Sequence, residues 1–187
     1  MDKTIITITG PSGSGKTTLE TNLCKKGGVF SKVISHTSRE KRENEEDNVD
    51  YHFVDKTFFL ENEDKFLEKV SFSGNFYGVA ENSLIKDKIN IIVVEPEGYR
   101  QLSAYCHEHG IRHESIGLRL NKTAQKKRML FRGDQLLDTI NRIEFENISE
   151  EMLSLDFDLE INVENINEKQ VYYMVLGYLF SKGVIKC

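Results

Sequence analysis

Several residue types are scarce in this chain or missing from it. Among 187 residues there is no tryptophan, and there are two prolines and three cysteines. Cys24, Cys106 and Cys187 are widely spaced and odd in number, which indicates neither a disulfide framework nor a zinc site and fits a reducing cytosol. No apolar run reaches the roughly 20 residues of a membrane span, and no signal peptide precedes the first predicted strand. We therefore expect a cytoplasmic protein that does not associate with membranes.

An excess of positive charge is also absent. The chain has 25 lysines and arginines against 30 aspartates and glutamates, which gives a net charge of −5. This balance argues against a general nucleic-acid-binding surface, so any anion site must be a local cluster of arginine and lysine. The hydrophobic share of 39% and the charged share of 29% are ordinary for a globular protein. The length suits a single domain over residues 1–187 with a substantial core.

What the sequence does contain is a phosphate-binding motif near its start. Gly10-Pro11-Ser12-Gly13-Ser14-Gly15-Lys16-Thr17-Thr18 matches G-x-x-x-x-G-K-S/T at every fixed position. The glycines let backbone N–H groups surround a polyphosphate, Lys16 reaches the β- and γ-phosphates, and the Thr17 hydroxyl ligates Mg²⁺. A β-branched strand over residues 4–9 precedes the loop, and a helix over residues 17–26 points its positive end at the phosphates. We therefore predict a nucleotide-binding loop at residues 10–18.

Strand and helix patterns alternate along the rest of the chain. We predict further strands at residues 30–35, 51–54, 89–95, 111–120 and 157–163. We predict further helices at residues 56–62, 97–109, 121–132, 134–148 and 167–181. Apolar faces are expected at Leu136, Leu137 and Ile140 of the fourth of these helices, and at Met174 and Val175 of the last. The pattern predicts an α/β fold.

Residues 36–50 are densely charged, and their local pattern alone predicts a solvated loop. After it, aromatic and apolar residues return at 51–54 and again at 66–72 around Glu68. Residues 73–78 are predicted to form a turn rich in small residues. These segments indicate a second patch of short strands, inserted after the helix that follows the phosphate-binding loop.

The order and spacing of four segments resemble the guanylate kinases. They are Ser35-His36-Thr37-Ser38-Arg39-Glu40-Lys41-Arg42, Asp50-Tyr51-His52-Phe53-Val54, Phe66-Leu67-Glu68 and Phe72-Ser73-Gly74-Asn75-Phe76-Tyr77-Gly78. The resemblance implies a P-loop NTPase core of three layers with a parallel sheet, formed by residues 1–33, 83–120 and 151–187. It also implies a small mixed α/β insert that binds the nucleoside monophosphate (residues 34–82) and a helical lid (residues 121–150). The implied activity is ATP-dependent phosphorylation of GMP or dGMP, with Mg²⁺ as the cofactor of ATP.

The same resemblance assigns the acceptor site. It implies that the acceptor phosphate is held by Ser35, Arg39, Arg42, Tyr51 and Tyr77. Two arginines three residues apart, beside hydroxyl donors, can grip a phosphate dianion through charge-assisted hydrogen bonds. Glu68 occupies the position that binds guanine, and an ionised carboxylate is a suitable partner for adjacent N–H donors because it only accepts hydrogen bonds.

Two positions around the base depart from the family pattern. Val79 stands where the family has a serine or threonine that contacts guanine, and valine has no donor. Val93 and Glu95 replace the two aspartates of an aspartate-x-aspartate segment at the end of a core strand. Glu95 is expected to serve the base or ribose, or to support the region of Lys16 and Mg²⁺. These changes leave the base preference open and do not touch the residues that hold phosphate.

The resemblance also covers the lid and the adenine site. Residues 128–133 and 141–143 resemble the guanylate kinase lid, in which Arg132 and Arg142 would fold over the triphosphate. Arg128 would lie near the adenine or the phosphates, and Asn162, at the end of the last strand, near the adenine.

Two alternative functions remain open at this point. One is a kinase of the same fold that acts on another nucleoside monophosphate or on a phosphorylated sugar, which Val79 and Glu95 motivate. The other is a non-catalytic binding module of guanylate-kinase-like fold, which the intact Lys16 and Thr17 argue against. The expected partners are small-molecule nucleotides, in a monomer or a homodimer.

Overall fold

We describe the fold from a computed structural model of the chain. The structure describes residues 4–25, 28–43, 45–72, 74–133, 135–145 and 148–186, apart from the side chains at positions 138, 141, 142, 144 and 145.

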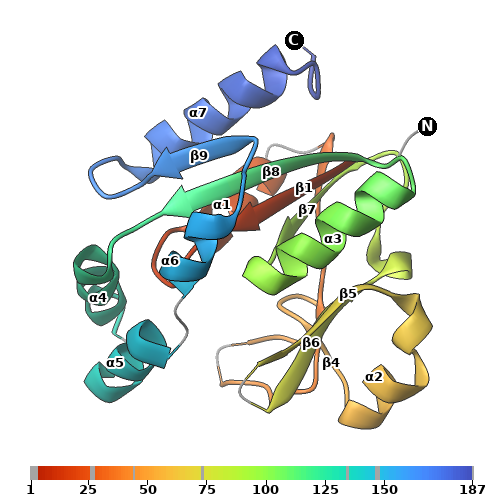
Figure 1. Cartoon of the computed structure of the whole chain (residues 1–187), viewed down its shortest axis with the longest axis horizontal. Helices are drawn as coiled ribbons and strands as arrows, with labels where there is room; N and C mark the ends of the chain where they lie inside the picture. Colours follow the sequence, from red (N-terminus) through yellow and green to blue (C-terminus); the bar gives the residue numbers. More distant parts are fainter. Residues whose placement is uncertain are drawn as a thin grey trace.

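The larger of two sheets consists of five parallel strands in the order β2-β7-β1-β8-β9 (Figure 1). Its strands are β1 (Thr4–Thr9), β2 (Phe30–Lys32), β7 (Ile89–Val93), β8 (Arg112–Arg119) and β9 (Leu159–Asn162). β1 lies in the centre, with Ile6 paired to Ile91 of β7 and Ile8 to Ile116 of β8. The predicted α/β class with a parallel sheet is thus confirmed. The strand predicted at residues 30–35 ends at Lys32, because the chain leaves this sheet and enters the smaller one at His36.

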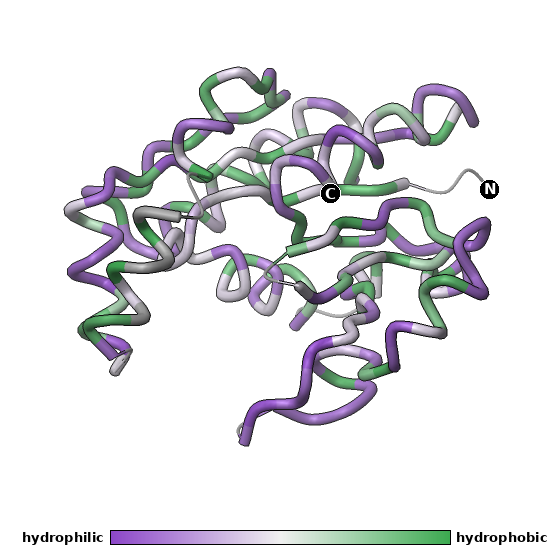
Figure 2. The backbone as a smooth tube through the Cα atoms, turned by 60° about the horizontal axis from the view of Figure 1, so that its bottom comes forward, coloured by the Kyte–Doolittle hydropathy of each residue, from purple (hydrophilic) through white to green (hydrophobic). Residues whose placement is uncertain are grey.

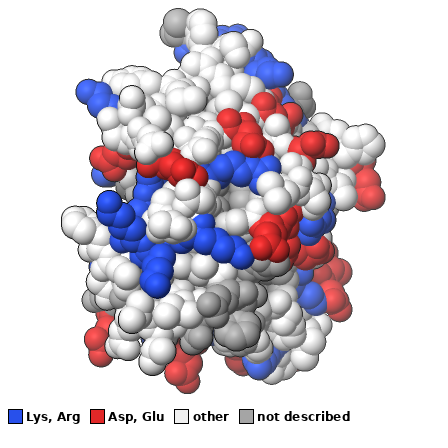
Figure 3. Space-filling view, turned by 60° about the vertical axis from the view of Figure 1, so that its left-hand side comes forward, with Lys and Arg blue, Asp and Glu red and all other residues white. Residues whose placement is uncertain are grey.

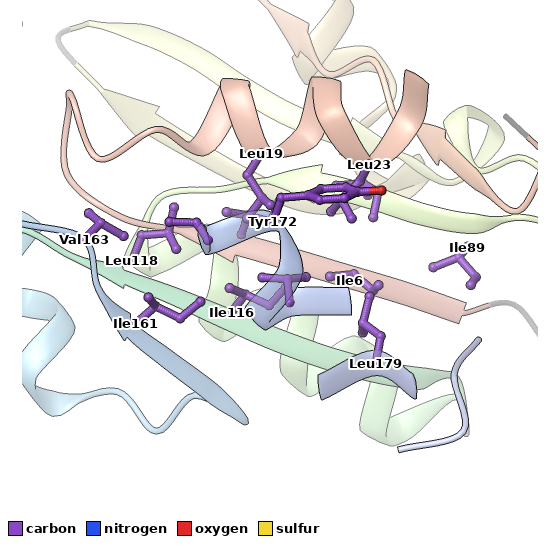
Figure 4. Close-up of a cluster of buried hydrophobic side chains, with 14 of the residues drawn as sticks. Ile6, Leu19, Leu23, Ile89, Ile116, Leu118, Ile161, Val163, Tyr172 and Leu179 are labelled. Atoms are coloured by element: carbon purple, nitrogen blue, oxygen red, sulfur yellow. The ribbon is translucent and has the colours of Figure 1, made fainter. Parts of the chain in front are cut away.

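Helices cover both faces of this sheet. The helices α1 (Lys16–Lys25) and α7 (Glu168–Ser181) pack on one face, and α3 (Pro96–Glu108) packs on the other. Because side chains alternate along a strand, Ile6 and Ile8 of β1 belong to the buried cluster on the side of α1 and α7, whereas Ile5 belongs to the cluster on the side of α3. Figure 4 shows the first cluster, with Ile6 of β1 near Leu23 of α1. Hydrophobic residues concentrate along these inner strands, and the peripheral loops are mostly hydrophilic (Figure 2).

The two ends of α7 follow the sequence closely, but its predicted inner face is partly wrong. Asn167 caps the helix, and its side chain accepts from the backbone N–H of Gln170 at 3.0 Å. Val175 is fully buried, as predicted, whereas Met174 is 47% exposed. Met174 lies on the outer side of α7, where no element of the described residues covers it. Among the helices in the described parts of the chain, none has the length and apolar character needed to cross a bilayer.

The smaller sheet has four strands in the order β4-β3-β6-β5. They are β3 (His36–Thr37), β4 (His52–Phe53), β5 (Phe66–Phe72) and β6 (Asn75–Ala80), accompanied by the helix α2 (Lys56–Glu61) and the short 3-10 turns η1 (Glu63–Lys65) and η2 (Glu81–Ser83). The predicted turn at residues 73–78 is wrong over most of its length, because β6 begins at Asn75. A tight connection suffices here, since Phe72 pairs directly with Asn75 and Gly74 has a φ of +74°.

The smaller sheet is fixed to the core through α3. The Gln101 side chain of α3 accepts from the backbone N–H of Lys69 at 2.9 Å and donates to the carbonyl of Lys69 at 3.2 Å. Leu67 and Val79 are buried in the same cluster as Leu102 of α3. The base of the smaller sheet is therefore part of the hydrophobic core, and its orientation relative to the larger sheet is set by packing.

A group of helices follows β8 and projects from the core (Figure 1). It contains α4 (Lys122–Phe131), α5 (Leu136–Phe145), α6 (Ile148–Glu151) and the 3-10 turn η3 (Met152–Ser154). Asn121 caps α4 by accepting from the backbone N–H of Ala124 at 2.8 Å, and Gly133 follows its end with a φ of +98°. The apolar face expected at Leu136 and Leu137 is largely exposed, at 51% and 73%, at the outer end of this group.

Candidate active site

A cavity of about 760 Å³ opens where the core, the smaller sheet and the helices α4 and α6 meet. It lies beyond the carboxyl ends of β1 and β7, which is where ligands bind in open parallel sheets. Most of the residues that the sequence singled out line it: Pro11, Ser12, Gly13, Gly15, Lys16, Thr17, Thr18, Ser35, Arg39, Arg42, Tyr51, Glu68, Tyr77, Glu95, Arg128 and Arg132. The fold therefore brings the phosphate-binding loop, the smaller sheet with its loops, the end of β7 and the helix α4 to one cavity.

The phosphate-binding loop forms one wall of this cavity. Gly13 and Gly15 adopt φ values of +78° and +93°, which turn the backbone between β1 and α1. The Lys16 ammonium folds back along the loop, where it donates to the carbonyl of Gly10 and lies 3.4 Å from that of Pro11. Gly10 and Ser14, which were predicted to bind ATP, are buried beneath the loop and do not line the cavity. They pack tightly against each other, because the Cβ of an alanine at position 10 would lie 2.6 Å from Ser14 Oγ.

The opposite wall carries a cluster of cations and hydroxyls from the smaller sheet. Arg39, Arg42, Tyr51 and Tyr77 all line the cavity, together with Ser35 at the exit from the core. The Tyr51 and Tyr77 rings meet edge to face with centroids 6.2 Å apart, and the Arg39 guanidinium lies 5.5 Å from the Tyr51 ring centroid. Burial raises the pKa of Tyr51, so its hydroxyl keeps its proton. The cluster offers two guanidinium groups and two phenolic donors to one anion.

Sequence reasoning missed Glu45, which lies within this cluster. Its carboxylate forms a two-point ion pair with Arg39, with N–O distances of 2.7 and 2.8 Å. That hydrogen bonding lowers the pKa of Glu45 below its ordinary value. Glu45 belongs to the charged run that predicts a solvated loop, and it lies six positions after Arg39. The positions between them form no regular helix or strand in the sequence pattern, so local pattern gave no signal for the pair.

Glu68 occupies the inner part of the cavity. Its side chain is 5% exposed, and its loss of hydration raises its pKa to about 8, an effect that the backbone N–H of Val79 partly offsets. Gly98 on α3 leaves room for this carboxylate, because a Cβ there would lie 2.9 Å from Glu68 Oε2. Gly98 could not be singled out from the sequence, because the side chain that approaches it belongs to another element, β5.

The positions that depart from the family pattern lie in different surroundings. Val79 pairs with Glu68 across β5 and β6, is fully buried and does not line the cavity. Val93 is the last residue of β7, Glu95 lies two positions later, and both line the cavity. Glu95 is exposed and immediately precedes α3, so its carboxylate faces the hollow from the core side.

The lid residues separate into two groups. Arg132 lines the cavity from the end of α4. Arg128 also lines it, but its guanidinium donates to backbone carbonyls, to Gly13 and Glu164 at 3.3 Å each and to Val163. Arg128 therefore ties α4 to the phosphate-binding loop and to the end of β9. The side chain of Arg142 lies outside the described part of the structure.

Asn162, predicted beside the adenine, lies at the end of β9 and does not line the cavity. Its side chain accepts from the backbone N–H of Glu164 at 3.0 Å and is otherwise exposed. Any contact with a nucleotide requires that the base extend along this edge of the sheet.

Charge is distributed unevenly on the face that carries the cavity. Figure 3 shows lysine and arginine side chains gathered around the hollow, with aspartate and glutamate beside them. The protein as a whole carries a net charge of −5, so this gathering is a local feature. Five lysines and arginines and five glutamates line the cavity. Its charge is therefore mixed, and the cations that face it can attract an anion only locally.

Comparisons with known proteins agree with this geometry. The guanylate kinase family model matches residues 1–173. A guanylate kinase of Prochlorococcus marinus is 31% identical over 176 residues, which cover 89% of this chain and 92% of that protein. The match to a guanylate kinase of Nitrosospira multiformis is 37% identical over 107 residues and spans about half of each protein, 54% of this chain and 51% of the relative.

A solved structure shares the fold. The crystal structure of guanylate kinase from Anaplasma phagocytophilum superposes with a TM-score of 0.69 at 21% identity, and the match covers 100% of this chain and 89% of that one. Together with the family match over residues 1–173, this confirms the predicted family. The chain belongs to the guanylate kinase family, whose members are nucleoside monophosphate kinases.

Proposed function

We propose that this protein transfers the γ-phosphoryl group of ATP to the phosphate of GMP or dGMP, forming ADP and the corresponding diphosphate. The observation that carries the proposal is that one cavity is lined both by the phosphate-binding loop and by the cluster of Arg39, Arg42, Tyr51 and Tyr77. Two anion-binding walls that face a common hollow suit a reaction between two phosphate groups. The family membership and the relatives named guanylate kinase support the same activity.

The chemistry requires positioning and charge neutralisation more than proton transfer. The attacking oxygen of a monophosphate is already anionic, so no general base is needed. The donor phosphates are held by the loop amides and Lys16, and the acceptor phosphate by Arg39 and Arg42. Each cation that contacts the charge developing in the transition state lowers the activation free energy by on the order of 3 kcal/mol.

The residues around Thr17 fit a magnesium ion that arrives with ATP. Mg²⁺ keeps several waters and takes one or two protein ligands together with substrate phosphates, so a cage of carboxylates is not required. No cluster of three or more metal-binding side chains occurs among the described residues, and the Thr17 hydroxyl is exposed at the cavity wall beside Lys16. Bound there, Mg²⁺ would neutralise charge on the donor phosphates. We assign Glu95, which lines the cavity directly before α3, to the support of its water shell.

Glu68 is the residue that we assign to the base. A guanine presents adjacent N–H donors, and an ionised carboxylate in a dry pocket accepts from both. Val79 contributes packing behind Glu68 and no hydrogen bond from its side chain, so recognition depends more heavily on this one carboxylate. We assign the contacts to ATP in the lid to Arg132 and Arg142, and we assign residues 34–82 and 121–150 to the parts that close and exclude water.

An acceptor panel tests the proposal. Purified protein with Mg²⁺ and ATP would be offered GMP, dGMP, AMP, CMP, dTMP and ribose bisphosphate, and the phosphorylated products would be separated by chromatography. We expect product with GMP or dGMP at rates at least tenfold above those with the other acceptors. A base without two adjacent N–H donors would leave the buried Glu68 carboxylate without hydrogen bonds, which is unfavourable. ATP hydrolysis alone, with no phosphorylated acceptor, would refute a kinase function.

A further inference from the structure

Glu45 is unusual among the acidic side chains of the 36–50 segment because it faces the cavity and is largely buried. Its side chain is 15% exposed, and it lies among the residues that line the hollow. It accepts three hydrogen bonds: from Arg39 Nη1 at 2.8 Å, from Arg39 Nη2 at 2.7 Å, and from the backbone N–H of Arg42 at 2.9 Å. A negatively charged group thus stands in a site that has to receive a phosphate dianion.

The Arg39 guanidinium is held from several directions. Besides the two bonds to Glu45, its Nη1 donates to the carbonyl of Glu40 at 2.7 Å. Its Cζ lies 5.5 Å from the Tyr51 ring centroid and 5.7 Å from that of Phe53. The guanidinium is therefore held by hydrogen bonds to a carboxylate and a carbonyl, and it lies over two aromatic rings. Fixing a flexible arginine in advance lowers the ordering cost of a later contact.

Glu45 also acts on the second arginine. The backbone of Arg42 donates to the same carboxylate, while the Arg42 side chain is 58% exposed and its Nη1 lies 3.8 Å from Glu45 Oε1. One carboxylate thus determines the path of the chain between the two arginines. If it were removed, both the direction of Arg39 and the position from which Arg42 reaches the cavity would change.

We propose that Glu45 is a positioning residue for the acceptor phosphate, which acts through Arg39 and Arg42 and does not itself contact the nucleotide. The proposal rests on the function proposed above. It predicts the direction in which GMP affinity changes when Glu45 is replaced, because the two effects of Glu45 on a phosphate dianion are opposed. Its charge repels the phosphate, whereas its hydrogen bonds prepare the arginines that bind it.

The substitution Glu45→Gln separates these effects. Charge alone predicts that the variant binds GMP more tightly, since one repelling charge is gone. Positioning predicts weaker binding, because a neutral amide replaces charge-assisted bonds and its NH₂ group points a donor at a guanidinium. We expect the KM and the Kd for GMP to rise about 10- to 100-fold, as follows from the loss of a hydrogen bond to a charged group.

The matched control is Glu43→Gln. It removes the same charge from the same loop, but Glu43 is exposed and does not line the cavity. For the natural protein and both variants we would measure kcat, the KM values for GMP and ATP, the Kd for GMP by calorimetry, and the Tm. We expect the control to match the natural protein, and Glu45→Gln to change the constants for GMP while the KM for ATP stays within about twofold.

A second background tests whether Glu45 acts through Arg39. In a protein that already carries Arg39→Ala, adding Glu45→Gln should weaken GMP binding by less than about a third of its effect in the natural background, because residues in one network are not additive. An unchanged or lower Kd for GMP in Glu45→Gln would overturn the proposal. An equal rise of the KM for ATP, or a fall in Tm that accounts for the loss, would overturn it as well.

Failure of the underlying function would be recognised separately. It would show as an absence of GMP phosphorylation by the natural protein itself. The calorimetric Kd for GMP would still decide the role of Glu45 in that case, because it does not depend on turnover. If the natural protein does not bind GMP at all, both proposals fall together.

Discussion

The two walls of the cavity are built in different ways. The phosphate-binding loop shapes its wall with main chain: Gly13 and Gly15 take left-handed φ values, and Lys16 rests on the carbonyl of Gly10. The opposite wall is shaped by side chains that hold one another, as in the pair of Arg39 with Glu45 and the fit of Glu68 against Gly98. Backbone geometry resists small changes, whereas side chains can yield.

This difference predicts which property a substitution in each wall will change. A backbone wall has no alternative arrangement, so an added atom must displace the chain and disturb the fold. A wall of side chains can absorb an added atom by a small rotation, so the change is felt in the binding of one ligand. Substitutions in the two walls should therefore differ in kind as well as in size, the first acting on stability and catalysis and the second on the affinity for the acceptor.

The largest effect is expected from Lys16→Ala. Lys16 is the residue of the backbone wall that we assign to the transferred group, and its loss should therefore lower kcat by about 10²- to 10³-fold. Steady-state kinetics with saturating GMP and ATP would measure it. The acceptor wall is untouched, so the calorimetric Kd for GMP should stay within about twofold of the natural value. A kcat within tenfold of the natural protein would contradict the assignment.

The next largest effect is expected from Gly10→Ala. Its Cβ would lie 2.6 Å from Ser14 Oγ and 2.8 Å from the carbonyl of Leu118, and the second of these is backbone that has little freedom to move. We expect the free energy of unfolding in urea to fall by about 1 to 3 kcal/mol, as for overpacked interiors. The control is Gly177→Ala in α7, where an added Cβ meets nothing within 4 Å. That change should leave stability unaltered or raise it, because alanine favours a helix.

The backbone wall could be predicted from the sequence more fully than the side-chain wall. The phosphate-binding loop is contiguous, so its strand, loop and helix could be predicted from residues 4–26 and lie where expected. The acceptor residues were found through their resemblance to a family, and their partners Glu45 and Gly98 were not found. Gly98 is identified by a contact between separate segments and Glu45 by a contact within an irregular loop, and a helix or strand pattern indicates neither of them. The apolar face predicted at Leu136 and Leu137 did not indicate whether anything covers it, and both residues are exposed.

A smaller and more specific effect is expected from Gly98→Ala in the side-chain wall. The added Cβ would lie 2.9 Å from Glu68 Oε2, and this neighbour is the end of a side chain that can shift. We expect the KM for GMP to rise about tenfold, as for a misplacement of one recognition group, while the free energy of unfolding changes by less than about 1 kcal/mol. The KM for ATP serves as the internal control. A loss of stability as large as that of Gly10→Ala would contradict the distinction between the walls.

The smallest effect, and the most diagnostic for Glu68, is a pH dependence of acceptor binding. Burial raises the pKa of Glu68 to about 8, so the carboxyl of the free protein is mostly protonated at pH 7. Guanine requires the ionised form, since only that form accepts from both N–H groups. Binding must therefore release a proton at pH 7, and affinity should increase as pH rises through 8. We expect the KM for GMP to fall about fivefold between pH 7 and pH 8, with little further change above pH 9.

The control for this pH dependence is Glu68→Gln, which has nearly the same size and does not titrate. Its KM for GMP should be higher at every pH and almost flat between pH 7 and 8, because the amide presents one acceptor and one donor regardless of pH. Protons released on GMP binding can be counted by calorimetry in buffers of different ionisation enthalpy, and close to one should be released at pH 7 by the natural protein and none by the variant. A natural protein that releases no proton would mean that Glu68 is already ionised before the base arrives. The side-chain wall would then be as fully prepared for its ligand as the backbone wall is, and the difference between them would be limited to how each responds to added atoms.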